Sequence, residues 1–168
     1  MSATNRGTIR NENDFYPTPI YSVSPLLNLI KWDKVISFLE PCRGDGAIYN
    51  LVDTKVKQWA EINEGIDYLT TSFAKRDLII TNPPFTFAKE FLEKSLTESD
   101  CVCYLLRLNY LGSQARKPFW NKVGTPNKLL ILSKRPSFTG KGTDATEYAW
   151  FCWDKSELIN LPNGIHII

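Results

Sequence analysis

Four short runs rich in Ile, Val and Leu recur at wide spacing along the chain, at residues 34–39, 77–81, 101–106 and 128–133. Their apolar residues are nearly continuous and do not alternate with polar ones. This pattern is typical of strands in a parallel sheet that helices cover on both faces. The chain is therefore expected to form an α/β structure.

Segments between these runs carry helical patterns. Residues 47–57 and 86–96 have apolar side chains every three or four positions, as an amphipathic helix requires. Residues 58–62 are a weaker strand candidate and 147–153 a strong one. No helical period separates 133 from 147, so the last strands should pair antiparallel, like a hairpin. We expect a Rossmann-like fold with a mostly parallel sheet of seven or slightly fewer strands and an antiparallel last hairpin.

Length and composition limit the class of protein. A chain of 168 residues with 43% hydrophobic and 23% charged residues is expected to form one globular domain. Residues 1–13 are polar and aperiodic and are interpreted as a flexible tail, which leaves 14–168 as a single domain without a separate target-recognition domain.

No apolar run approaches the ~20 residues of a membrane span, so no membrane partner is expected. The start of the chain lacks a signal peptide's apolar core, which favours a cytoplasmic location. With His166 as the one histidine, no metal site is expected.

Charge is unevenly distributed along the chain. Residues 107–141 contain eight Lys or Arg and no Asp or Glu, whereas the rest holds twelve basic and all 18 acidic residues, for a net charge of +2. Aromatic side chains at Tyr110, Phe119 and Trp120 lie among the cations. This composition favours a polyanion-binding surface with stacking groups. Cations scattered over a solvated face are the alternative.

The first motif with chemical meaning follows the first predicted strand, in the sequence from Glu40 to Ile48. An acidic residue at the strand end precedes Gly44 and Gly46, and a helix is expected directly afterwards. Glycine lets the backbone approach a ligand, and free N–H groups at a helix start attract one. The turn therefore favours nucleotide binding, although a simple strand-to-helix connection has the same features. It lacks the three spaced glycines of a dinucleotide site.

The second motif ends the predicted strand 77–81 with the tetrapeptide from Asn82 to Phe85. Two prolines stiffen the backbone and remove N–H donors. The Asn82 side-chain oxygen and the Pro83 carbonyl can then accept hydrogen bonds from one NH₂ group, and Phe85 offers a flat stacking face. The tetrapeptide is suited to holding a planar amine. A plain turn after the strand is the alternative.

Together the two motifs resemble those of S-adenosylmethionine-dependent amino-methyltransferases, and most closely the phage-type DNA adenine methyltransferases. Segment 40–47 is similar to that family's methionine-binding glycine loop, and 82–85 to its catalytic Asn-Pro-Pro-Phe tetrapeptide. Residues 14–19, 59–62 and 65–69 resemble further cofactor-binding segments, and 107–120 and 135–150 also look like phage members. Arg43 departs from the small residue often found in the loop. The resemblance implies a class I methyltransferase fold.

The resemblance also implies roles for individual residues. Glu61 is expected to bind the cofactor's ribose hydroxyls, and Asp67 its adenine amino group. The implied catalytic residues are Asn82, Pro83, Pro84 and Phe85. The implied cofactor-binding residues are Tyr16, Pro17, Thr18, Pro19, Glu40, Pro41, Gly44, Asp45, Gly46, Glu61, Ile62, Asp67, Tyr68 and Asn82. The expected nucleic-acid contacts are Arg107, Asn109, Tyr110, Arg116, Lys117, Trp120, Lys122, Arg135 and Lys141.

The function that these resemblances imply is methyl transfer from S-adenosylmethionine to the exocyclic amine of adenine in DNA, with S-adenosylhomocysteine as product. Double-stranded DNA is the favoured partner and RNA the alternative acceptor, and the resemblance is compatible with a homodimer. Such an enzyme would serve restriction-modification or evasion of host defence, in the host cytoplasm if a phage encodes it. A cofactor-binding but inactive nucleic-acid-binding subunit is the alternative from a different class.

Overall fold

The structure is a computed structural model that describes residues 17–140 and 142–168. The predicted tail 1–13 and the predicted contacts Tyr16 and Lys141 lie outside the described residues.

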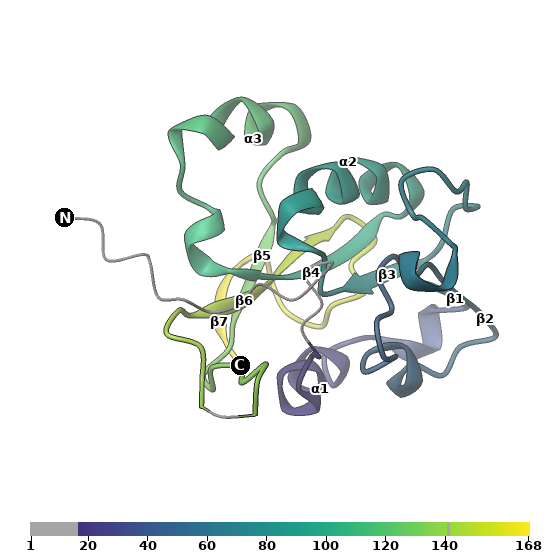
Figure 1. Ribbon diagram of the computed structural model, residues 1–168, viewed down its shortest axis with the longest axis horizontal. Coiled ribbons are helices and arrows are strands. Elements are labelled where there is room, and N and C mark those ends of the chain that lie inside the picture. The colour runs from purple at the N-terminus through teal and green to yellow at the C-terminus, as the bar shows by residue number, and fades with distance from the viewer. Residues whose placement is uncertain (1–16, 141) are drawn as a thin grey trace.

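A seven-stranded sheet forms the centre of the molecule (Figure 1). Its strands are β1 (Ser37–Glu40), β2 (Val56–Trp59), β3 (Leu78–Thr81), β4 (Cys101–Arg107), β5 (Lys128–Ile131), β6 (Tyr148–Asp154) and β7 (Gly164–Ile167). Their order across the sheet is β2-β1-β3-β4-β6-β5-β7. Strand β6 is antiparallel to β4 and β5, and the other pairs are parallel. The predicted α/β fold with an antiparallel last pair is confirmed.

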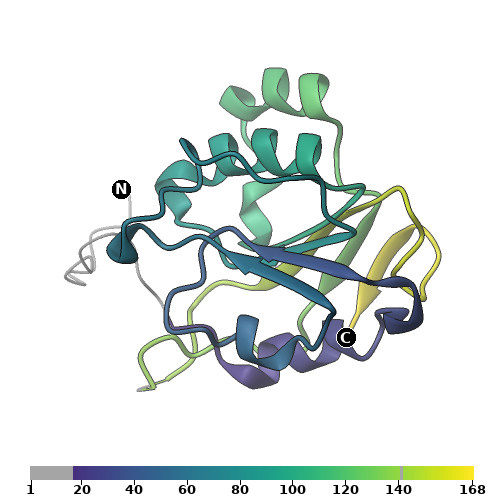
Figure 2. The ribbon, with the colours of Figure 1, turned by 90° about the vertical axis from the view of Figure 1, so that its right-hand side faces the viewer.

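Helices cover both faces of the sheet (Figure 2). Helix α1 (Ile20–Leu27) packs on one face, and α2 (Ala88–Glu98) and α3 (Lys117–Val123) pack on the other. Side chains of β4 alternate between the two: Cys103 and Leu105 join the core under α1, whereas Tyr104 joins the core under α2. Both faces of this central strand are therefore apolar, which explains its continuous hydrophobic run.

Two local expectations are wrong. Residues 47–57 form no long helix: a short 3-10 turn (Tyr49–Leu51) is followed directly by β2. The regularly spaced apolar side chains are buried all the same: Ile48 and Val52 are both 1% exposed and pack into the core from this turn. The stretch 162–165, interpreted from its sequence as a terminal turn and tail, leads instead into β7, which lies at the sheet edge beside β5.

One cation of segment 107–141 lies in the core. The Lys128 ammonium is 2.5 Å from the Asp154 carboxylate, and both side chains are buried. Burial by itself would raise the pKa of Asp154, but the Lys128 ammonium and the backbone N–H groups of Leu158 and Ile159 together lower it. Lys128 therefore belongs to the interior and not to a ligand-binding face.

Candidate functional site

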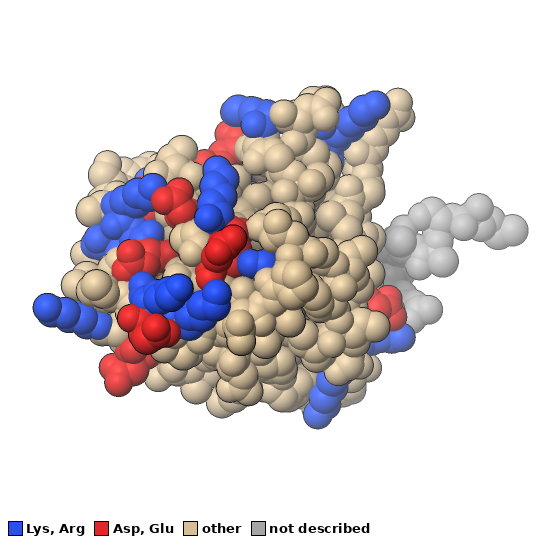
Figure 3. All heavy atoms as spheres, turned by 180° about the vertical axis from the view of Figure 1, so that it is seen from behind, with Lys and Arg blue, Asp and Glu red and all other residues tan. Residues whose placement is uncertain are grey.

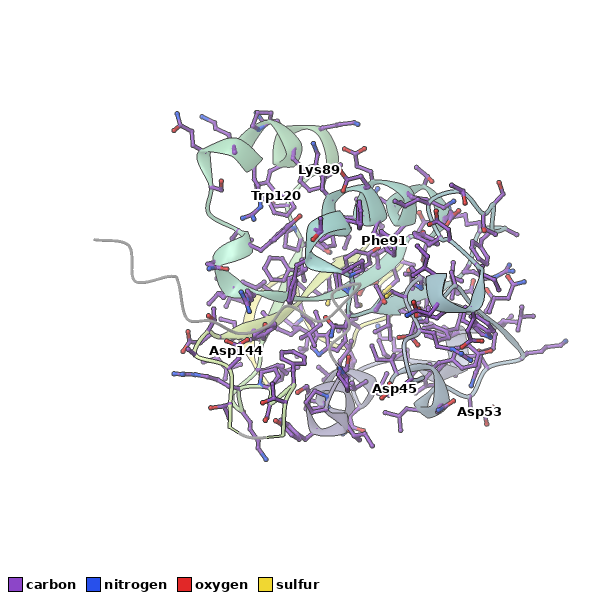
Figure 4. All side chains as sticks on the ribbon, viewed as in Figure 1. Asp45, Asp53, Lys89, Phe91, Trp120 and Asp144 are labelled. Carbon is purple, nitrogen blue, oxygen red and sulfur yellow. The ribbon has the colours of Figure 1, made fainter. Side chains whose placement is uncertain are left out.

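A cavity of about 480 Å³ opens at the carboxyl ends of β1 and β3. These strands are parallel neighbours, so the glycine loop after β1 and the tetrapeptide after β3 reach the same edge of the sheet. Asp45 from the loop and Phe91 from α2, both labelled in Figure 4, are among the residues that line it. The carboxyl edge of an open α/β sheet is where ligands generally bind.

Most residues predicted to bind the cofactor line this cavity. The predicted site residues in its wall are Thr18, Glu40, Pro41, Gly44, Asp45, Glu61, Ile62, Asp67, Tyr68, Asn82, Pro83 and Pro84. Pro17, Pro19, Gly46 and Phe85 are not in the wall, and neither is any predicted nucleic-acid contact that the structure describes. Residues of both motifs therefore line one cavity, and no described residue of segment 107–141 lines it.

The glycine loop is tied to the end of β2 through Glu61. The Gly44 backbone N–H donates to Glu61 Oε2 at 2.8 Å, and that of Asn63 donates to Oε1 at 3.1 Å. Each carboxylate oxygen can accept more than one hydrogen bond, so these contacts are compatible with the predicted binding of a diol. Arg43, the loop's unusual residue, stacks on the Trp59 ring at 4.0 Å and pairs with Glu64.

Gly46 has a backbone conformation that disfavours any side chain. Its φ is +87°, and an added Cβ would lie 2.8 Å from Asn50 Nδ2. We predict that Gly46→Ala lowers the free energy of unfolding by roughly 1–2 kcal/mol, the cost of a left-handed residue with a Cβ. Urea denaturation measures this. Gly112→Ala is the matched control, because nothing lies within 4 Å of its added Cβ; equal losses in both variants would refute the explanation.

Glu40 is the most unusual group of the site. It is 1% exposed, and within the described part of the chain its Oε2 atom has no hydrogen-bond partner. Desolvation by burial raises the pKa of this carboxyl well above its ordinary value. A hydrogen bond from the Tyr49 backbone N–H and the nearby Arg43 guanidinium counteract the shift only in part. A buried polar atom without a partner in a cavity wall indicates a ligand group that would complete it.

Asn82 contacts the segment before α1. Its amide Nδ2 donates to the Thr18 hydroxyl at 3.1 Å. Behind it, the Thr81 hydroxyl donates to the Cys42 carbonyl at 3.4 Å, which joins the end of β3 to the glycine loop. The Pro84 carbonyl accepts the Phe87 N–H at 3.0 Å and so shapes the turn into α2.

The aromatic residue in the cavity wall differs from the predicted one. Phe85 lies beside the Tyr148 ring, with 6.5 Å between centroids, and 5.1 Å from the Arg107 guanidinium. Phe87, which the sequence reasoning missed, lines the cavity and is 50% exposed. Phe91 lines it one helical turn later, and this spacing of four residues is the signal that would have identified the pair.

Asp67 and Tyr68 reach the cavity in different ways. Asp67 Oδ1 accepts the Leu69 N–H at 2.9 Å. The Tyr68 hydroxyl is directed into the core, where it donates to Glu98 at 2.6 Å and contacts Ser95 at 2.9 Å. Burial raises the pKa of Tyr68, which keeps the hydroxyl protonated. Tyr68 can therefore offer a ligand its ring and not its hydroxyl.

Segment 107–141 is less uniformly basic in space than in sequence. Acidic partners neutralise four of its cations: Arg107 with Asp144 at 3.3 Å, Lys122 with Glu93 at 3.2 Å, Lys128 with Asp154 at 2.5 Å and Arg135 with Glu147 at 2.9 Å. Figure 3, viewed from behind Figure 1, shows most of the charged side chains of that face intermixed on the side of β1 and β2. Lys117 and Asn109 are exposed. Lys128 is buried and lies outside the predicted basic face, whereas Arg107, Lys122 and Arg135 stay exposed, each beside an acidic partner.

The aromatic residues of this segment mostly pack against one another. Trp120, labelled in Figure 4, stacks on Trp153 with 6.2 Å between ring centroids, and its indole N–H donates to the Leu111 carbonyl at 3.1 Å. Tyr110 packs edge-on against Trp120 and lies beneath the Arg116 guanidinium, 4.0 Å away. These rings stabilise α3 against the sheet, which limits their use as stacking platforms.

The cavity fits S-adenosylmethionine in size and chemistry. Its volume of about 480 Å³ lies within the range of small-molecule sites, ~300–1,000 Å³. The carboxylates of Glu40 and Glu61 suit a cationic ligand with ribose hydroxyls, and Ile62 and Phe87 supply apolar surface.

Among the described residues, no three His, Cys, Asp or Glu side chains are arranged to hold a metal ion. No helix in residues 17–140 and 142–168 has the length and apolar character needed to cross a membrane.

The chain is similar to known proteins in structure but matches none of the compared families or curated proteins in sequence. A provisionally assigned class I S-adenosylmethionine-dependent methyltransferase from Listeria monocytogenes has a TM-score of 0.62 at 13% identity, over 96% of this chain and 67% of that one. A provisionally assigned RNA methyltransferase from Pyrococcus horikoshii also has a TM-score of 0.62, at 18% identity over 85% of this chain and 88% of that one.

A third similar structure is the modification subunit of a provisionally assigned type I restriction enzyme from Vibrio vulnificus. Its TM-score is 0.58 at 16% identity, and the match covers 84% of this chain but 45% of that one. At such identities the similarity establishes architecture and not activity. Sheet order, helices on both faces and these matches together show that the chain has the Rossmann-like fold of class I S-adenosylmethionine-dependent methyltransferases.

Proposed function

We propose that the protein is an S-adenosylmethionine-dependent methyltransferase that modifies the exocyclic amine of adenine in DNA. One observation carries this proposal: a single cavity is lined both by the glycine loop with Glu40 and by the Asn82-Pro83-Pro84 segment. A cofactor holder and an amine holder are thereby placed within reach of each other. Holding two reactants in this way supplies much of the rate enhancement of a group transfer.

The cofactor would lie between the glycine loop and the end of β2. Glu40 offers a cationic group its Oε2 atom, which has no hydrogen-bond partner among the described residues. Glu61 can accept hydrogen bonds from ribose hydroxyls, and Ile62 provides an apolar surface for a base. When bound, S-adenosylmethionine supplies a methyl group activated by the positive charge on its sulfur.

Asn82 and Pro83 would hold the acceptor amine. An exocyclic amine is a weak nucleophile because its lone pair is delocalised into the ring. Hydrogen bonds from both amine hydrogens to the Asn82 and Pro83 oxygens favour a pyramidal nitrogen and localise that lone pair. Asn82 does not act as a base; the methylated nitrogen is acidic enough to lose its proton to water.

The proposed acceptor is a base in DNA, which must leave its stack to enter the cavity. Exposed Lys117 and the partly exposed Arg116 are near the start of α3 and would contact phosphates. The similar structures include both the modification subunit of a provisionally assigned restriction enzyme and a provisionally assigned RNA methyltransferase. RNA adenine is therefore the second candidate acceptor. A cofactor-binding inactive subunit is less well supported, because Asn82 lines the cavity.

The proposal is tested by incubating the protein with tritiated S-adenosylmethionine and either unmodified duplex DNA or RNA. We expect tritium in DNA, and chromatography of the hydrolysed DNA should assign it to methyladenine. Sequencing of the methylated adenines would then give the target site. Transfer to RNA alone would reject the DNA acceptor and retain the amine chemistry. Cofactor binding without transfer to either would support the inactive subunit.

A further inference from the structure

A hydrogen bond connects two cavity residues that are distant in sequence. Asn82 Nδ2 donates to Thr18 Oγ1 at 3.1 Å, across 64 positions of the chain. Both residues are partly buried, and both line the cavity. The contact therefore belongs to the wall of the proposed reaction site.

Both partners lie on backbone that has little freedom. Thr18 is flanked by Pro17 and Pro19, and Asn82 is followed by two prolines. Proline fixes its own φ and keeps the preceding residue extended. Pro19 has φ −64° and ψ 134° and leads directly into α1, whose Val23 and Leu26 are fully buried. The Thr18 hydroxyl is consequently held in place by an anchored helix.

The two ends of the Asn82 amide are chemically opposite. The proposed reaction needs the carbonyl end to face the acceptor amine, because an amide NH₂ facing an amine NH₂ would set donor against donor. Rotation about the last side-chain bond exchanges these ends at little steric cost. Since Nδ2 donates to Thr18, Oδ1 points to the other side of the amide.

We propose that Thr18 is a positioning residue for methyl transfer, and that its hydroxyl, which accepts the hydrogen bond from Nδ2, restrains the position and plane of the Asn82 amide. A hydroxyl can donate as well as accept, so the contact limits the motion of the amide and does not by itself select which end faces Thr18. This inference rests on the proposed function and assigns Thr18 a role other than the cofactor contact implied by the sequence resemblance. The two roles differ in their kinetic effects. Loss of a cofactor contact raises the KM for S-adenosylmethionine, whereas loss of amide orientation lowers kcat.

Thr18→Val and Thr18→Ser separate these roles. Valine keeps the branched shape without the hydroxyl, and serine keeps the hydroxyl. We expect Thr18→Val to lower kcat about tenfold, the effect of one well-placed hydrogen bond, with little change in the KM for the cofactor. Thr18→Ser should stay close to the wild-type kcat. In an Asn82→Ala background, Thr18→Val should cause no further loss, because it acts through that amide.

A second measurement does not depend on activity. The Asn82 side-chain amide gives a pair of ¹H–¹⁵N signals, identified by their absence in Asn82→Ala. Thr18→Val should shift these signals and speed their exchange with water, with an unchanged melting temperature. Unchanged signals would overturn the inference even if no acceptor is known. A raised KM with unchanged kcat, or an equal loss of kcat in the Asn82→Ala background, would also overturn it. Wild-type protein that transfers no methyl group despite the expected signal shift would instead refute the proposed function.

Discussion

Asn82→Ala is expected to reduce kcat for methyl transfer roughly a hundredfold to a thousandfold, the usual effect of removing one preorganised hydrogen-bonding group from an active site. The side chain lines the cavity, and the amide oxygen is the acceptor that the proposed chemistry needs. Alanine leaves the backbone and both following prolines in place. The dissociation constant for S-adenosylmethionine should therefore change little, which calorimetry can measure alongside single-turnover rates.

Asn28→Ala is the matched control, because Asn28 is exposed at the end of α1 and lies outside the cavity wall. Its kcat should equal that of the wild type. An Asn82→Ala protein with full activity would contradict the amine-holding role.

Glu40→Gln is expected to weaken binding of S-adenosylmethionine roughly tenfold to a hundredfold, the effect of losing a hydrogen bond to a charged group. The buried Oε2 atom, which has no partner among the described residues, would bind a cationic group of the cofactor. Glutamine has nearly the same shape but no charge. Equilibrium dialysis or calorimetry measures the change, and Glu90→Gln, at an exposed position on α2, is the control.

The same substitution should stabilise the protein without ligand. Because burial raises the pKa of Glu40 above its ordinary value of 4.5, ionisation opposes folding. This cost is absent below about pH 4.5, where the carboxyl is protonated in both the folded and the unfolded chain, and it grows as the pH rises toward the folded-state pKa. Glu40→Gln should therefore exceed the wild type in free energy of unfolding by an amount that increases with pH, reaching roughly 1–2 kcal/mol. A difference independent of pH would show that Glu40 is not a strained carboxylate.

Local pattern predicted the central strands well and the connections poorly. Continuous apolar runs mark β1, β3, β4 and β5 because helices cover both faces of the sheet. The spacing at residues 47–57 was misleading, since Ile48 and Val52 reach the core from a turn. A helix and a compact loop can bury the same apolar residues, and the sequence period does not distinguish them. Strand β7 was missed because its Ile165 and Ile167 remain 71% and 75% exposed.

The sequence by itself determined where the two motifs meet. Gly44 and Asn82 each follow a buried strand, and the family resemblance of the two motifs implied a shared site. The parallel pairing of β1 with β3 then brings both motifs to one edge of the sheet. Tertiary structure alone decided which groups serve that site. It pairs Asn82 with Thr18, turns Phe87 toward the cavity in place of Phe85, and neutralises Arg107 and Lys122 with acids from elsewhere. The reason is physical: hydrogen bonds and ion pairs depend on distances of a few ångströms between side chains that are far apart along the chain, and such distances exist only once the sheet and helices have packed.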